Sequence, residues 1–162
     1  MAVKLEVFDM RKLASPLLFL LLAVSLAVPA FASERGTPDE AVALAKKAAA
    51  YIKENGADTA YAAFNSGQNG WKDRDLYVAV TDMQGNVKAH GANKGLVGRN
   101  LTGLKDPDGV KIVEKMIQVA RDSGTGWVEY RWPNPVTKKL ERKASYVIRT
   151  GDVMVMVGAY KG

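Results

Sequence analysis

The sequence contains no cysteine, and this absence removes several kinds of chemistry at once. Among its 162 residues there is no Cys, so disulfides, thiolate zinc sites, iron–sulfur clusters and cysteine nucleophiles are all excluded. Histidine occurs once, as His90, and a single histidine cannot build a histidine-rich metal site. Spacing alone suggests no serine–histidine–acid arrangement. We therefore expect no catalytic residue, no metal and no cofactor, and a protein that is not an enzyme.

The sequence also lacks a concentrated basic tract, although its formal net charge is +6. The 23 lysines and arginines are spread along the chain and usually stand beside acids, as in residues 72–75. Nucleic-acid binding requires basic residues gathered on one face, so we expect no nucleic-acid partner. Residues 138–143 are the exception. On a turn between two strands they predict a local positive patch, which we interpret as a solvated hairpin end.

Long apolar runs are confined to the N-terminal end. Residues 13–32 carry no charge, two basic residues precede them, and Ala30-Phe31-Ala32 closes the run. A secretory signal peptide has this order of basic residues, an apolar stretch and small residues, and the pattern predicts cleavage after Ala32. The residues before Met10 are unusually acidic for such a segment, which suggests Met10 as the true start of translation.

We therefore predict that residues 1–32 are a signal peptide and that residues 33–162 form a single domain, periplasmic or secreted in a bacterium. The alternative is an uncleaved anchor, because a charge-free stretch of this length approaches what a bilayer span requires. The domain would then stay tethered to the membrane. Nothing later in the sequence is apolar enough to span a membrane, so no span is expected after cleavage of the signal.

The rest of the sequence has the order of helices and strands typical of an α+β domain. Thr37-Pro38-Asp39-Glu40 predicts a capped helix start with Glu40 as the acid of a capping box, and Asn55-Gly56 predicts the end of that helix. Asp108 is expected to cap a later helix. The expected helices are 38–55, 58–64 and 108–122, and the expected strands are 76–81, 87–90, 126–132, 143–149 and 153–160. The strands should form an antiparallel sheet of about five, with the long first helix on one face and residues 91–109 as an ordered surface excursion.

Period-two alternation sorts the side chains of two late strands onto opposite faces. It places Tyr130 and Trp132 on one side of the first strand, and it places Lys143 and Ser145 together on one side of the second. Facing a pocket, these residues offer an aromatic wall, a hydroxyl and a cation, and an ammonium group in a partly dry site pairs strongly with a carboxylate. The alternatives are a solvated lysine at a strand start and plain aromatic packing in the core or at an edge.

Four ordered motifs, residues 76–85, 95–101, 126–135 and 143–147, resemble the single-Cache family of sensor domains. The resemblance covers residues 38–160. It implies a PAS-like antiparallel sheet with the long first helix on one face, and a pocket for small organic ligands, often short carboxylates, on the other.

The same resemblance assigns roles to individual residues. It implies that Lys143 contacts an acidic ligand and that His90 is a hydrogen-bonding group of the pocket, and Arg99 is included because it stands in the 95–101 motif, within reach of the pocket. With Tyr130 and Trp132 these are the expected ligand-binding residues. The alternatives are a surface histidine at a strand end and an arginine that fixes its loop through backbone carbonyls.

Members of that family usually lie between two membrane helices of chemoreceptors or sensor kinases, which implies a role in sensing, signal transduction and chemotaxis. This sequence stops at Gly162, directly after the last expected strand. We therefore expect a freestanding extracytoplasmic module that binds a small organic acid and passes its state to a separate membrane receptor or kinase. The alternative is a structural or interaction domain of a membrane complex that binds no ligand.

Overall fold

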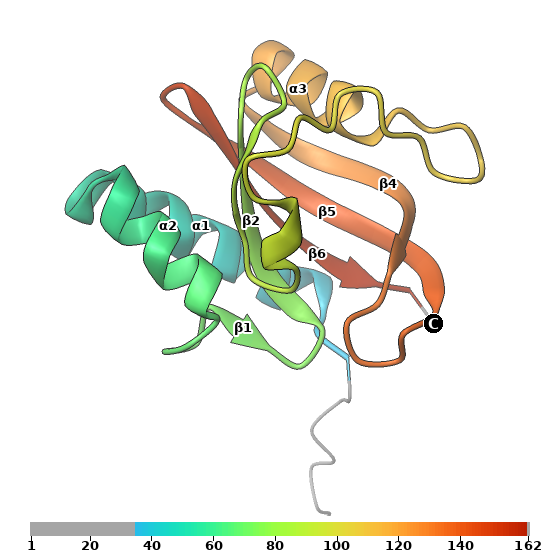
Figure 1. Ribbon diagram of the computed structural model, residues 1–162, viewed down its shortest axis with the longest axis horizontal. Helices are drawn as coiled ribbons and strands as arrows, with labels where there is room; N and C mark the ends of the chain where they lie inside the picture. The colour runs from blue at the N-terminus through green and yellow to red at the C-terminus, as the bar shows by residue number, and fades with distance from the viewer. Residues whose placement is uncertain (1–34, 162) are drawn as a thin grey trace, which may run out of the picture. The chain divides into compact units, whose positions relative to one another are not determined.

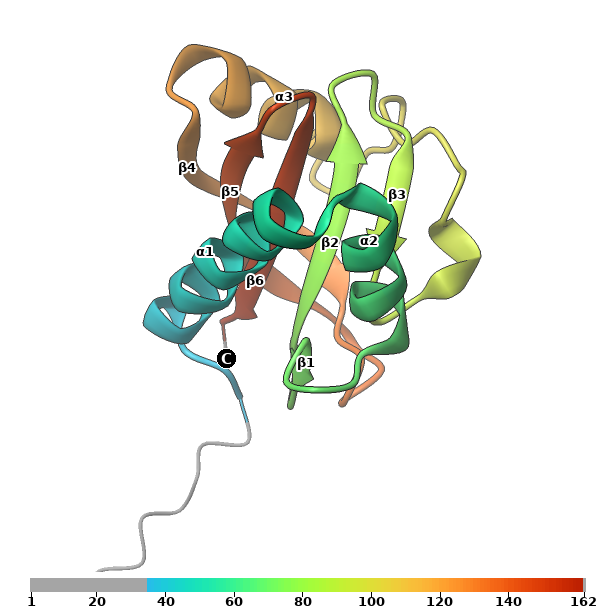
Figure 2. The same ribbon diagram turned by 90° about the vertical axis from the view of Figure 1, so that its left-hand side faces the viewer.

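An antiparallel sheet with helices against both of its faces makes up the described part of the protein (Figures 1 and 2). The computed structural model describes residues 35–161, and the predicted signal peptide lies outside them. The strands are β1 (Lys72–Asp73), β2 (Leu76–Asp82), β3 (Val87–His90), β4 (Thr125–Pro133), β5 (Leu140–Thr150) and β6 (Val153–Tyr160). They run in the order β1-β2-β6-β5-β4, and β3 also pairs with β2. The predicted α+β fold is confirmed, and the two-residue β1 makes the sheet 6-stranded.

The long first helix, α1 (Pro38–Asn55), packs on β5 and β6. It begins with the predicted capping box: the Thr37 N–H donates to the Glu40 carboxylate (2.8 Å), and the Glu40 N–H donates to the Thr37 hydroxyl (3.2 Å). The buried residues of the helix are all alanines: Ala41, Ala45, Ala48 and Ala49. Because these side chains are small, the helix can lie close against the sheet.

A second helix, α2 (Ala57–Ser66), covers the β2 and β3 side of the same face (Figure 2). It is slightly longer than predicted. Its Phe64 packs edge-on against Trp71, with 4.7 Å between the ring centroids, and also contacts Tyr51. Together α1 and α2 bury one face of the sheet. Among residues 35–161, the helices are too short or too polar to cross a bilayer.

The third helix, α3 (Ile112–Asp122), packs on the opposite face (Figure 1), with the predicted apolar side buried. Its start differs from the prediction, because Asp108 does not cap it. The Asp108 carboxylate instead accepts from the Arg131 guanidinium (2.9 Å), and Asp106 accepts the N–H groups of Val110 and Arg131. These contacts to β4 hold residues 106–110 as a turn, so the helix begins only at Ile112.

Candidate ligand-binding site

A cavity of about 50 Å³ lies between the sheet and α3, on the face that α1 and α2 leave uncovered. The strands supply a polar and aromatic wall, and α3 with the preceding excursion supplies an apolar one. The strand wall includes Tyr77, His90, Tyr130, Trp132, Lys143 and Ser145, and the apolar wall includes Leu101, Leu104, Ile112, Val113 and Met116. One water needs ~10–15 Å³ of such space, so the cavity accommodates a small molecule of about four heavy atoms.

Lys143, on β5, is the cation of this cavity and is only 3% exposed. Its ammonium Nζ lies 3.4 Å from the Tyr160 hydroxyl, 3.9 Å from the centre of the Tyr77 ring and 4.5 Å from that of the Tyr160 ring. Among residues 35–161, no carboxylate forms an ion pair with it. Burial lowers the pKa of Lys143 to about 7, against an opposing effect of Asp75. The amine is therefore poised between its charged and neutral forms near neutral pH.

His90, at the end of β3, is 6% exposed and stacks on Tyr77 with 4.9 Å between the ring centroids. Its Nδ1 accepts the N–H of Asn93 (3.0 Å), so the neutral ring carries its proton on Nε2. Burial, and secondarily the charge of Lys143, lower the pKa of His90 to about 4. His90 is therefore a neutral hydrogen-bond donor at physiological pH.

Tyr130 and Trp132 alternate on β4 as predicted and stand edge to face, with 6.0 Å between their centroids. The Tyr130 hydroxyl lies 2.8 Å from the Ser145 hydroxyl, and burial raises the pKa of Tyr130 well above its ordinary value. It remains a neutral phenol. Within the described ranges no group of three or more acidic or histidine side chains could hold a metal ion.

Residues 31–162 match the family described as Single Cache domain 2. The chain belongs to this family. Single Cache domains are extracytoplasmic sensor domains and typically bind ligands without transforming them. The predicted membership is confirmed.

Relatives of this Cache domain occur within larger signalling proteins. The methyl-accepting chemotaxis protein McpP of Pseudomonas putida and the sensor histidine kinase MctS of Rhizobium johnstonii are each 35% identical to it over 75 residues, or 46% of the chain. The match spans 14% of the first protein and 16% of the second. The chain therefore corresponds to a small part of each.

Solved structures share the fold at lower identity. A methyl-accepting chemotaxis protein from Vibrio parahaemolyticus has a TM-score of 0.66 at 22% identity, over 75% of this chain and 86% of that one. A structure titled for carboxylic acid recognition by a Cache chemosensory domain has a TM-score of 0.61 at 22% identity, over 76% of this chain and 88% of that one. These likenesses confirm the predicted PAS/Cache-like fold.

The structure brings most of the predicted site residues of the Cache domain together. Lys143, Tyr130, Trp132 and His90 all line the one cavity. Arg99 does not: it is exposed and lies outside the cavity lining, with its backbone carbonyl accepting the Val87 N–H (2.9 Å). Arg99 is therefore left out of the proposed site. Burial of Lys143 also makes the predicted positive patch at 138–143 smaller than expected.

Sequence reasoning missed other residues of the Cache cavity. Tyr77 and Thr81 line it from β2, and alternation along that strand could have placed them on one face. Within the described residues, the buried Thr81 hydroxyl has no hydrogen-bond partner. Gly158, on β6, lines the cavity between Lys143 and Ser145. No pattern in the sequence marks that glycine.

Replacing Gly158 by alanine is expected to displace Lys143. An added Cβ would lie 2.2 Å from the Ser145 Oγ and 2.4 Å from the Lys143 Cε, which is too close without rearrangement. We expect Gly158→Ala to lower the free energy of unfolding by about 1–3 kcal/mol, as overpacking does. Urea unfolding checks this. Gly103→Ala, where nothing lies within 4 Å of the added Cβ, is the control, and equal stability of the two variants contradicts the prediction.

Proposed function

We propose that this Cache domain binds a small carboxylate, with Lys143 as the partner of the anion. The observation that carries the proposal is a buried ammonium group that lines a cavity and, in the described part of the chain, has no acid paired with it. Its neighbours are two aromatic faces and one hydroxyl, so N–H donors remain for a ligand. In a site of low dielectric, an ammonium–carboxylate pair is strong.

Other groups of the cavity suit a short organic acid. The His90 ring and the Thr81 hydroxyl supply hydrogen bonds, and Tyr130 and Trp132 pack against a short carbon chain. The size of the cavity matches acetate, and pyruvate and lactate, which are larger by two heavy atoms, test how far the site adapts to a three-carbon acid. The carboxylic acid recognition named for one structure of the same fold supports this ligand class.

The proposal extends to where and how the domain acts. The relatives are a chemotaxis protein and a sensor histidine kinase, which supports extracytoplasmic sensing whose output passes to a membrane receptor or kinase. The ligand-bound state is then the signal, and no chemical transformation of the acid is needed.

Isothermal titration of the purified protein with acetate, pyruvate and lactate at pH 6 tests the proposal. At that pH Lys143, with its pKa of about 7, is mostly charged, so we expect saturable binding of at least one acid. Lys143→Ala should lose it, because removing the cation leaves the anion unpaired in a dry site. Lys139→Ala, which removes an exposed lysine of the same hairpin, should bind as the wild type does.

Binding should also weaken about tenfold for each pH unit above 7, because the neutral amine no longer attracts an anion. The absence of binding by any of the three acids at pH 6 would overturn the proposal. Capture of a stoichiometric protein partner without ligand would instead favour a structural or interaction domain.

A further inference from the structure

Two opposite charges are buried at the same end of the sheet. Lys143 is 3% exposed and Asp75, just before β2, is 1% exposed. The other buried carboxylate of the described residues, Asp106, is held by backbone N–H groups of its own turn and of β4. Burying a charge without compensation is costly, so two opposite charges buried near one another are expected to stabilise each other.

Lys143 and Asp75 lie on, or next to, the two strands that flank β6. Lys143 pairs with Tyr160 across β5 and β6. Asp75 directly precedes β2, which pairs with β6 on the side opposite β5, with Val78 opposite Val157. Adjacent strands are about 4.8 Å apart, so the two backbones are separated by about 10 Å, and the side chains of a lysine and an aspartate shorten that gap.

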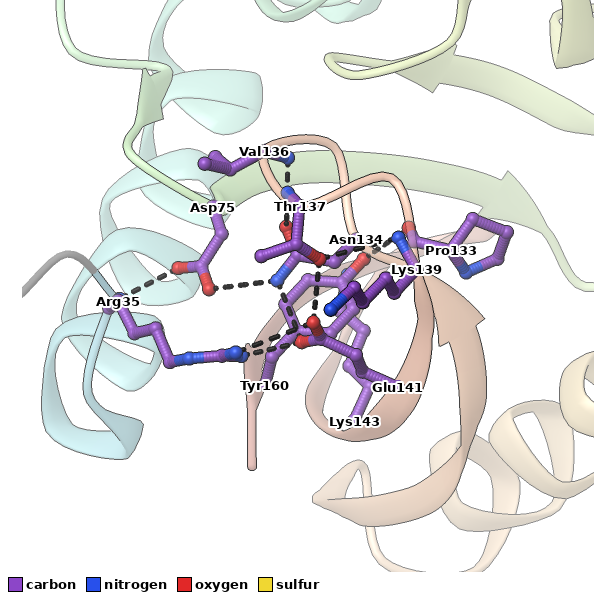
Figure 3. Close-up of polar contacts among 11 residues, drawn as sticks. Arg35, Asp75, Pro133, Asn134, Val136, Thr137, Lys139, Glu141, Lys143 and Tyr160 are labelled. Atoms are coloured by element: carbon purple, nitrogen blue, oxygen red, sulfur yellow. Dashed lines mark hydrogen bonds and ion pairs between the residues drawn. The ribbon is translucent and has the colours of Figure 1, made fainter. Parts of the chain in front are cut away.

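The Asp75 carboxylate is fixed by two uncharged donors (Figure 3). It accepts the Gly36 N–H at 2.7 Å and the Asn134 side-chain amide at 3.3 Å. The carbonyl of Pro133, next to Asn134, accepts the Tyr160 hydroxyl at 2.8 Å. The loop after β4 therefore orients both the carboxylate and the tyrosine that separates it from Lys143.

Asn134 is itself held rigidly, and it is 1% exposed. Its side-chain oxygen accepts the N–H groups of Val136 and Thr137 (2.8 and 3.2 Å), and its amide also donates to Glu141 (3.0 Å). Glu141 in turn pairs with Arg35, which with Thr137 lowers its pKa to about 2. This network keeps Asn134, and with it Asp75, in one position.

We propose that Asp75 is a positioning residue for the ligand site: its fixed negative charge, held by Gly36 and Asn134, keeps the Lys143 ammonium charged for an incoming anion. The inference rests on the proposed function, because it assigns the charge state of the residue that binds the acid. It is supported by the pKa of Lys143, which burial lowers and the charge of Asp75 raises.

Other titratable groups around Lys143 do not supply this charge. On the cavity side, the three tyrosines have raised pKa values and His90 a lowered one, so all are neutral near pH 7: Tyr77, Tyr130, Tyr160 and His90. On the outer side, a shallow hollow also contains acids and arginines: Asp106, Asp108, Glu129, Arg131 and Arg142. Asp108 pairs with Arg131, and Glu129 pairs with Lys161. Asp106 accepts two backbone N–H groups, so each acid of this hollow is engaged locally.

The test is an NMR titration of the Lys143 side chain in the ligand-free protein, by its Cε resonance, in the wild type and in Asp75→Asn. We expect the pKa of Lys143 to fall by about one unit in the variant, because a buried opposite charge is lost. Asp73→Asn, which removes the exposed carboxylate that pairs with Arg74, should leave it unchanged. Asp75→Ser, which leaves room for a water on Gly36 and Asn134, gives the same readout where the isosteric variant does not fold.

Acetate or pyruvate titrations add a readout that a purely structural role would not give. Asp75→Asn should weaken binding about fivefold at pH 7, the loss of protonated lysine that one pKa unit produces there. At pH 5 it should bind as tightly as the wild type or more tightly, because Lys143 is then charged in both. An unchanged pKa of Lys143, or equal weakening at both pH values, overturns the inference. Failure of the wild type to bind any acid overturns only the proposed function, since the NMR readout needs no ligand.

Discussion

Lys143→Met is expected to raise the free energy of unfolding of the ligand-free domain by about 1–4 kcal/mol at pH 7, because the folded-state pKa of Lys143, about 7, lies well below its unfolded value and the folded protein therefore holds the charged amine at a cost. Lys143 is buried against the rings of Tyr77 and Tyr160, and methionine fills the same space without a charge. The variant should bind no carboxylate. Urea unfolding and calorimetric titration with pyruvate measure the two effects.

The gain in stability should depend on pH in a way that identifies its cause. Near pH 9.5 the wild-type amine is mostly neutral, because its pKa in the folded protein is about 7, so the advantage of methionine should largely disappear. Lys139→Met, at an exposed site, should change stability by less than about 0.5 kcal/mol at either pH. A Lys143→Met variant less stable than the wild type at pH 7 contradicts the prediction.

The stability of the ligand-free domain should rise in two steps as the pH increases. The folded-state pKa of His90, about 4, lies below its unfolded value near 6.5. In that window the unfolded state binds more protons, so stability increases with pH. We expect His90 to raise the free energy of unfolding by about 3 kcal/mol across this window, since each unit of pKa difference contributes about 1.4 kcal/mol.

Lys143 should produce the second step, from pH 7 to about 10. Its folded-state pKa of about 7 lies below the unfolded value near 10.5, so the unfolded state again binds the extra proton. We therefore expect the free energy of unfolding to rise by about 4 kcal/mol over this range. Above pH 10 the trend should reverse, because the buried tyrosines have raised pKa values and the unfolded state releases those protons first.

Urea unfolding at pH 4.5, 6.5 and 9.5 measures this profile. His90→Gln should flatten the first step and leave the second, and Lys143→Met should do the opposite. If the free energy of unfolding of the wild type does not change between pH 7 and 9.5, the Lys143 amine keeps its ordinary pKa. Its charge would then be stabilised by more than Asp75 alone, enough to offset the effect of burial.

Local features of the sequence predicted the parts of the fold that local contacts determine. The capping box of Thr37 and Glu40 joins residues three apart, and it forms as expected. Alternation correctly grouped Tyr130 with Trp132 on one side of β4 and Lys143 with Ser145 on one side of β5, because strand geometry alone decides that phase, and the family resemblance supplied the pocket that these sides line. The Asp108 cap failed for the opposite reason: its carboxylate is taken by Arg131, on a distant strand.

The network behind the cavity could not be foreseen. Residues 72–75 look like a solvated charged run, yet Asp75 is buried and bonded to Gly36 and Asn134, which are 39 and 59 residues away in the chain. Single-sequence patterns carry no information on such pairings. Arg99 was proposed only from its place in the 95–101 motif, and it is exposed and lies outside the cavity lining.

The hydrogen bond from the Gly36 N–H to Asp75 connects the buried carboxylate behind the cavity to the beginning of α1. The same carboxylate stabilises the cation that an anion would meet and anchors the residue just before the Thr37 cap. Equilibrium coupling between two sites is reciprocal. If a change at the start of α1 alters the affinity of the cavity for an acid by some factor, binding of the acid must alter the equilibrium at the helix start by the same factor.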